Sequence, residues 1–290
     1  MTQQHLTPSR LSFILLLVAS GVLGAGKLGA QSEGVSVSYS LESAATTTMH
    51  EPIIVQFEVY NGSKEPMTVQ LGADRTEGFA IQVKWPDGSA HKRPPAPVRE
   101  GIRRTGKVSL APGEHLRHEL LLNEWTSFNT PGEYELDVRL LTPIETAGRE
   151  FVSEPYHASF RVLPRDESQL KATCERLVRQ IESTDDVSTA RDAAAALAHV
   201  DDAIVVPYLE RALLSGKYVE GLIIAALARV GSEDAVQILL GVVNESPAWP
   251  PNVQTTAGTR AILAQQALQK IVATTSNERL KQEINGALPR

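Results

Sequence analysis

The spacing of the apolar residues changes once along this chain, near Pro164, and this change constrains the fold more than any other feature. Before it, in segments such as residues 35–41, apolar residues occupy every second position, which is typical of strands with one buried face. After it, in segments such as residues 170–181, they recur at every third or fourth position, which is typical of amphipathic helices. The sequence therefore predicts a multidomain protein, with a β-rich half followed by a helical half.

Residues 1–30 have the pattern of a secretory signal peptide. Arg10 provides a positive charge, residues 11–23 are almost wholly apolar, and Ala30 places a small residue before Gln31. The apolar run is shorter than the roughly 20 residues that a membrane-spanning helix needs. We therefore expect cleavage after Ala30 and an exported protein, periplasmic or extracellular in a bacterium. Such a protein meets the membrane only if its signal stays uncleaved.

The first half contains a series of short alternating segments separated by turn sequences. Asn61-Gly62 is typical of a tight hairpin, so the strand after it is expected to return along the strand before it. Seven or eight short strands within about 130 residues, with no helical pattern between them, favour an antiparallel β-sandwich over residues 34–164. The predicted strands are residues 35–41, 53–59, 67–71, 79–85, 108–110, 116–122, 134–140 and 156–162.

A short motif identifies the kind of sandwich. Tyr134 follows Gly132 by two residues at the start of a late strand. This looks like the tyrosine corner of immunoglobulin-like domains, in which the hydroxyl bonds to the backbone upstream. The stretch from Leu110 through Trp125 to Tyr134 also resembles the immunoglobulin-like domain of the intracellular proteinase inhibitor type. That resemblance implies an immunoglobulin-like fold and gives protease inhibition as an alternative function.

Three segments of the second half align with one another: Ala196–Val200, Ala226–Val230 and Ala267–Ile271. The first two are about 30 residues apart, which is a plausible period for a short helical repeat. A polar turn and a second helix follow each of these two segments. The pattern resembles the short bacterial HEAT repeat. That resemblance implies a HEAT-like α-solenoid over residues 166–290, with a concave face of the kind that often holds another protein.

The sequence offers little catalytic or metal-binding chemistry. It has no nucleophile elbow, phosphate loop, dinucleotide fingerprint or zinc-protease helix motif, so we expect neither an enzyme nor a cofactor. His115 and His118 lie three apart in a predicted strand and would point to opposite faces, which disfavours a shared metal ion. The pairs Asp185-Asp186 and Asp201-Asp202 carry oxygen ligands suited to calcium, but helix capping explains them more simply.

The net charge narrows the classes of partner, and the cysteine content limits the cross-links within the chain. The formal net charge of the chain is -6 at pH 7, which disfavours nonspecific binding to nucleic acid. The single cysteine, Cys174, rules out an internal disulfide. Cys174 shares its spacing with the apolar residues of its helix, so we interpret it as a buried small hydrophobe.

Two loops contain candidate partner-binding residues. A basic loop either docks an acidic partner or anionic surface, or is simply solvated. Trp249, in a proline-rich loop, either contacts a partner or covers the adjacent repeat. The basic residues of the first loop are Lys92, Arg93, Arg99, Arg103, Arg104 and Lys107.

These observations predict an exported, noncatalytic protein-binding scaffold. Its partner, a protein of unknown identity, is expected on the inner face of the array, where successive second helices would form a continuous surface. Two alternatives stand beside this one: an inhibitor of a secreted or periplasmic protease that acts through the sandwich, and an envelope hydrolase without a recognisable motif. We also expect the two halves to fold independently, because each has its own apolar set.

Overall fold

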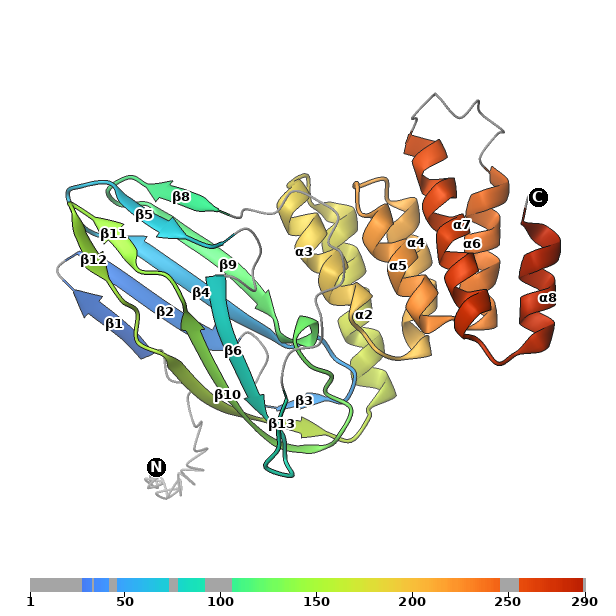
Figure 1. Ribbon diagram of the computed structural model, residues 1–290, viewed down its shortest axis with the longest axis horizontal. Helices are drawn as coiled ribbons and strands as arrows, with labels where there is room; N and C mark the ends of the chain where they lie inside the picture. The colour runs from blue at the N-terminus through green and yellow to red at the C-terminus, as the bar shows by residue number, and fades with distance from the viewer. Residues whose placement is uncertain are drawn as a thin grey trace, which may run out of the picture.

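The computed structural model describes residues 28–32, 34–41, 46–72, 78–91, 106–245 and 256–288, and all structural statements refer to these residues. A β-rich half and a helical half lie end to end along the long axis of the molecule (Figure 1). The predicted multidomain fold, a sandwich followed by a helical array, is confirmed. Within the described part of the chain, no helix is both long and apolar enough to cross a membrane.

The described strands form three sheets. In spatial order, the first contains β1 (Leu28–Ser32), β2 (Val35–Leu41), β4 (Ile54–Asn61) and β9 (His115–Leu121). The second contains β3 (Thr46–Thr48), β13 (Tyr156–Leu163), β10 (Gly132–Leu140), β6 (Phe79–Lys84) and β7 (Ala90–His91). The third contains β12 (Arg149–Phe151), β11 (Ile144–Thr146), β5 (Met67–Gln70) and β8 (Lys107–Leu110).

The first two sheets are the layers of an immunoglobulin-like sandwich. β2, β4 and β9 are antiparallel neighbours in one layer, and β13, β10 and β6 are antiparallel neighbours in the other, which is the strand division of that fold. The rings of Phe57 on β4 and Phe79 on β6 join the layers, with centroids 5.0 Å apart. The alternation seen in the sequence therefore buries one side of each strand in a shared core.

The predicted hairpin at Asn61-Gly62 is wrong. β4 pairs with β2 and β9, whereas β5 pairs with β8 and β11 in the third sheet. Neither Asn61 nor Gly62 has a positive φ. Asn61 is buried, and its side-chain amide donates to the carbonyls of Glu65 and Leu110, each at 2.9 Å. These hydrogen bonds of Asn61 fix the path of the chain where it leaves the first sheet.

The helices pack in two rows. One row contains α2, α4, α6 and α8, and the other contains α3, α5 and α7. The first aligned segment spans the end of α3, and the other two lie in α5 and α7. The sequence repeat therefore corresponds to one helical hairpin per step. The bounds are α2 (Glu167–Ser183), α3 (Val187–Ala198), α4 (Val206–Leu214), α5 (Glu220–Val230), α6 (Glu233–Glu245), α7 (Thr256–Thr274) and α8 (Glu278–Ala287), with short 3-10 turns η1 (Leu122–Glu124) and η2 (Ala203–Val205).

Aspartate side chains cap α3 and the 3-10 turn η2, as the capping interpretation predicts. Asp186 accepts a hydrogen bond from the Thr189 amide at 2.8 Å, and Asp202 accepts one from the Ile204 amide at 3.0 Å. Each bond satisfies an amide that the first turn leaves without a partner. Among the described residues, no group of three or more His, Cys, Asp or Glu side chains could hold a metal ion.

Cys174 lies in the core of the helical half and is fully buried. Burial raises the pKa of its thiol to about 12, and the acidic groups of Asp202 and Glu51 add to the effect. The thiol is therefore protonated at neutral pH. A protonated, buried thiol is a poor nucleophile, so the environment of Cys174 suits a packing residue.

Strand β1 contains the predicted cleavage position. Leu28–Ala30 pairs with Val37–Tyr39 along the edge of the first sheet. Cleavage after Ala30 would leave only Gln31 and Ser32 of this strand. We expect mass spectrometry of the exported protein to find Gln31 at its N-terminus, because a short apolar run and a small residue favour the peptidase. Recovery of the full-length chain from the membrane fraction would show that the signal is retained.

Candidate binding site at the domain junction

Most of the binding residues predicted from sequence lie outside the described residues: Lys92, Arg93, Arg99, Arg103, Arg104 and Trp249. Lys107 is described and lies in β8, with its Nζ 3.3 Å from a carboxylate oxygen of Glu145. Both side chains are exposed, so this ion pair contributes little to stability. Partner contacts by these residues remain predictions.

The two histidines of β9 lie on opposite faces of the strand. His115 is exposed, whereas His118 is buried and stacks on Phe79 with ring centroids 6.0 Å apart. They cannot share a metal ion in this arrangement.

Tyr134 and Gly132 have structural roles. The Tyr134 hydroxyl donates to the carbonyl of Thr130 at 2.8 Å, and its buried ring stacks on Phe160 with centroids 5.5 Å apart. Gly132 has a φ of +147°, and a Cβ there would lie 2.6 Å from the Pro86 ring. This is the geometry of a tyrosine corner, which holds the loop before β10 against the core.

The two halves meet around a buried carboxylate, that of Glu51, which is only 5% exposed. From the sandwich, Oε2 accepts from the Thr47 hydroxyl at 2.8 Å and the Thr48 amide at 2.9 Å. From α2, Oε2 accepts from Gln169 Nε2 at 2.8 Å and Oε1 accepts from the Thr173 hydroxyl at 2.5 Å. A buried carboxylate is costly unless hydrogen bonds satisfy it. Glu51 therefore favours one position of α2 against the sandwich.

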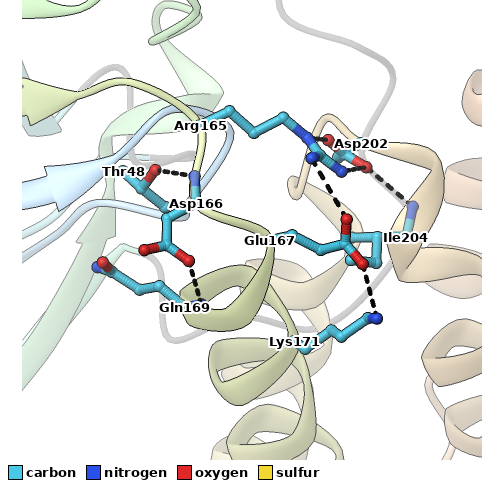
Figure 2. Close-up of polar contacts among 8 residues, drawn as sticks. All are labelled: Thr48, Arg165, Asp166, Glu167, Gln169, Lys171, Asp202 and Ile204. Carbon is cyan, nitrogen blue, oxygen red and sulfur yellow. Dashed lines mark hydrogen bonds and ion pairs between the residues drawn. The ribbon is translucent and has the colours of Figure 1, made fainter.

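The linker between the halves is tied on both sides, as Figure 2 shows. The Thr48 hydroxyl accepts a hydrogen bond from the Asp166 amide at 2.8 Å. It also donates to the Pro164 carbonyl at 2.7 Å. Arg165 donates through Nε at 2.5 Å and through Nη2 at 3.2 Å to the two carboxylate oxygens of Asp202. These hydrogen bonds from Arg165 are the main cause that lowers the pKa of Asp202. The linker is thus bonded to strand β3 and to the turn before α4.

Apolar contacts continue across the same boundary. Ile54 of β4 and Leu121 of β9 belong to the buried cluster that forms the core of the helical array. The sandwich therefore contributes two side chains to the helical core, and the junction buries both apolar and polar groups.

A cavity of about 150 Å³ lies beside this junction. Its walls come from both halves: His50, Asn123 and residues 126–129 on the sandwich side, and His199, Asp201 and Arg229 on the array side. Pockets that enclose a drug-sized ligand measure roughly 300–1,000 Å³. This cavity is therefore large enough for one functional group of a ligand, but too small to enclose a large substrate.

Arg229 brings a positive charge to the cavity. Its Nη2 donates to the carbonyls of Ala198 and Val200, the latter at 3.1 Å. Desolvation lowers the pKa of Arg229 although the residue keeps an exposed surface, and the charge of Asp201 opposes this shift. Among the described residues, no carboxylate forms an ion pair with Arg229.

His50 adopts an uncommon backbone conformation at the cavity. Its φ is 72°, in a turn closed by a hydrogen bond of 3.3 Å from the Glu51 amide to the Thr48 carbonyl. Positive φ is unusual for a residue with a Cβ, and such residues cluster at functional sites. The Nδ1 atom of His50 is buried and has no hydrogen-bond partner among the described residues. The turn therefore keeps an imidazole where glycine would be favoured.

Sequence reasoning missed this site, although one signal for part of it was present. The fourth position of each aligned repeat segment is basic: His199, Arg229 and Lys270. The first two of these residues line the cavity. Glu51 and His50 carried no such signal, since the α2 partners of Glu51 lie 118 and 122 residues away in the chain.

Comparisons with known proteins give only distant similarity. No family model matches the chain, and no curated protein matches it. Similar solved structures include alpha-2-macroglobulin from E. coli, with 10% identity, 87% of this chain and 20% of that chain covered, and a TM-score of 0.28. A mutant of Salmonella alpha-2-macroglobulin has 10% identity, coverages of 87% and 20%, and a TM-score of 0.27. A mutant β-glucosidase from Listeria innocua has 13% identity, coverages of 44% and 16%, and a TM-score of 0.21.

The matches with the two macroglobulins cover a β-rich region followed by a helical region over most of this chain, but they span only a fifth of the longer proteins. At these TM-scores the comparisons assign neither a family nor an activity.

Proposed function

We propose that this protein is an exported, noncatalytic binding protein, periplasmic or extracellular, which holds another protein on its helical array. The observation that carries the proposal is the junction at Glu51, where donors from both halves satisfy one buried carboxylate. A fixed junction presents the sandwich and the array in constant relative geometry. Such preorganisation lowers the entropic cost of binding a partner that touches both halves.

The distribution of charge favours one row of helices as the partner surface. In the row of α2, α4, α6 and α8, charged side chains already pair with one another. Arg211 bonds to Glu175 at 2.6 Å and to Glu182 at 2.9 Å. In the other row, Ala225 of α5 is exposed, and Ile262 of α7 is 57% exposed. Because interface cores are poor in charged residues, we place the partner on α3, α5 and α7, instead of on the second helices α4, α6 and α8.

The family resemblances support this proposal unequally. The resemblance of the array to short bacterial HEAT repeats supports protein binding by stacked helices. The resemblance of the sandwich to the intracellular proteinase inhibitor type supports the alternative, in which a sandwich loop blocks a protease. For a hydrolase, the cavity offers two lining hydroxyls, those of Thr126 and Ser127, and neither is hydrogen-bonded to a histidine among the described residues.

A matched pair of substitutions tests the proposed surface. Ala225 and Ala172 are exposed alanines on opposite rows, in α5 and α2. We expect A225E to weaken binding of a partner recovered from envelope extract by about tenfold, because it places an uncompensated charge within the interface. A172E should leave the affinity unchanged.

Both variants would be tested by surface plasmon resonance, with circular dichroism melting as the control for folding. Equal affinities for A225E and the unmodified protein would remove the α3, α5 and α7 row as the partner surface. A captured protease that is inhibited equally by both variants would favour the inhibitor alternative.

A further inference from the structure

We propose that the junction cavity is a carboxylate-binding subsite, and that it receives an acidic side chain or the C-terminal carboxylate of the protein held on α3, α5 and α7. The preference for a carboxylate follows from the cavity alone. The source of that carboxylate rests on the proposed function.

The cavity offers hydrogen-bond donors from both halves. The hydrogen bonds of Arg229 to Ala198 and Val200 use Nη2 alone, and its Nε and Nη1 groups take part in no hydrogen bond among the described residues. On the sandwich side, the hydroxyl of Ser127 and the amide of Asn129 are exposed and likewise make no hydrogen bond to a described residue. Nη2 belongs to both edges of the guanidinium that could hold a carboxylate through two parallel bonds, so Arg229 offers single charge-assisted hydrogen bonds from Nε or Nη1. The Ser127 hydroxyl and the Asn129 side-chain amide can add further donors.

The charges around the cavity also favour the binding of an anion, with one exception. Glu51 is satisfied by its own donors, and Asp202 is paired with Arg165. Asp201 lines the cavity, is exposed, and interacts electrostatically with Arg229 without forming an ion pair. Asp201 must weaken the binding of an anion by repulsion. Neutralising it should therefore strengthen carboxylate binding, which gives the proposal a test with a definite sign.

The position of the cavity connects it with the proposed partner surface. Arg229 follows Ala225 by four residues on α5, so the two side chains lie on the same face of the helix. Both residues are exposed on that face. A protein lying along α5 could therefore extend one side chain past Ala225 to the cavity at the end of the helix. The volume of about 150 Å³ suits a single carboxyl-bearing side chain.

The first experiment uses a small probe with the full chain. Propionate and its neutral analogue propionamide would be titrated into ¹⁵N-labelled protein while NMR follows the Nε–H signal of Arg229. We expect a saturable shift with propionate and a response at least tenfold weaker with propionamide. The substitution D201N should tighten propionate binding about threefold, because it removes the repulsion.

Controls separate binding from folding. R229Q should abolish the response of the neighbouring backbone amides to propionate, and its thermal melt shows whether loss of the bonds to Ala198 and Val200 has unfolded the array. S127A combined with N129A removes two of the donors on the sandwich side without removing any described hydrogen bond, and should weaken propionate binding several-fold. Equal responses to propionate and propionamide, or a response to propionate that neither D201N nor S127A/N129A alters, would overturn the subsite.

The second experiment uses the partner recovered from envelope extract. We expect D201N to strengthen partner binding and S127A/N129A to weaken it, in parallel with their effects on propionate. If these variants alter propionate binding but leave the partner affinity unchanged, the cavity serves a free small carboxylate and the partner assignment is wrong. If A225E weakens the partner but propionate does not bind, the proposed function survives and the carboxylate subsite fails.

Discussion

Replacement of Tyr134 by alanine is expected to destabilise the sandwich by about 3–5 kcal/mol. The ring is fully buried and packs between Phe160 and Phe128, with centroid distances of 5.5 and 5.3 Å. The substitution leaves a cavity in the core and removes the hydrogen bond to the Thr130 carbonyl. Equilibrium unfolding in urea would measure the change, with tryptophan fluorescence as the probe. Trp85 contributes to this signal, and its ring centroid lies 6.1 Å from that of Tyr134.

The variant Y134F separates the two contributions. It keeps the ring and removes only the hydroxyl. It should therefore lower the free energy of unfolding by about 1 kcal/mol, the usual net contribution of one hydrogen bond. A loss below about 1 kcal/mol for Y134A would contradict the assignment of Tyr134 as the corner residue, since a fully buried aromatic ring cannot be truncated so cheaply.

The longer strands could be predicted because each has enough residues to show an alternating pattern. β2 and β10, for example, bury every second side chain. The short strands β3, β7, β11 and β12 have only two or three residues each, which is too few to establish a period. Their pairing depends on distant partners, so no local pattern could reveal them.

Asn61 shows why a correct turn signal can still give the wrong connection. The dipeptide Asn61-Gly62 is a strong local signal for a hairpin. In the fold, the Asn61 amide bonds to Leu110, which lies 49 residues further along the chain. A long-range hydrogen bond thus determines where the chain goes, and the local propensity of the dipeptide does not.

The candidate site escaped prediction for a related reason. A glutamate in a turn, such as Glu51, is usually exposed, and only the packing of α2 onto the sandwich makes it buried. Arg229 was visible as a position in the helical repeat, but its place beside the sandwich depends on how the two halves meet. Sequence periodicity describes each half separately, so it contains no information about groups brought together at their junction.

Replacement of Glu51 by alanine is expected to lower the free energy of unfolding by about 3 kcal/mol or more and to uncouple the unfolding of the two halves. Hydrogen bonds to a charged group contribute about 1.5–3 kcal/mol each, and the substitution removes the acceptor of four such bonds, two of them from α2. Water entering the vacated space would accept hydrogen bonds from some of these donors and so reduce the loss of stability. If Glu51 couples the halves, differential scanning calorimetry should then show two transitions in E51A and one in the unmodified protein.

The control is E210A, which removes an exposed glutamate of α4 and should leave the calorimetric trace unchanged. The comparison also tests the expectation that the halves fold independently. Independent halves would give two transitions in the unmodified protein, and E51A would then lower at most one of them. A single transition that shifts to lower temperature without splitting would mean that the contacts of Ile54 and Leu121 with the helical core couple the halves without Glu51. Only a transition that splits on loss of Glu51 makes this carboxylate the group that holds the sandwich and the array in one unit.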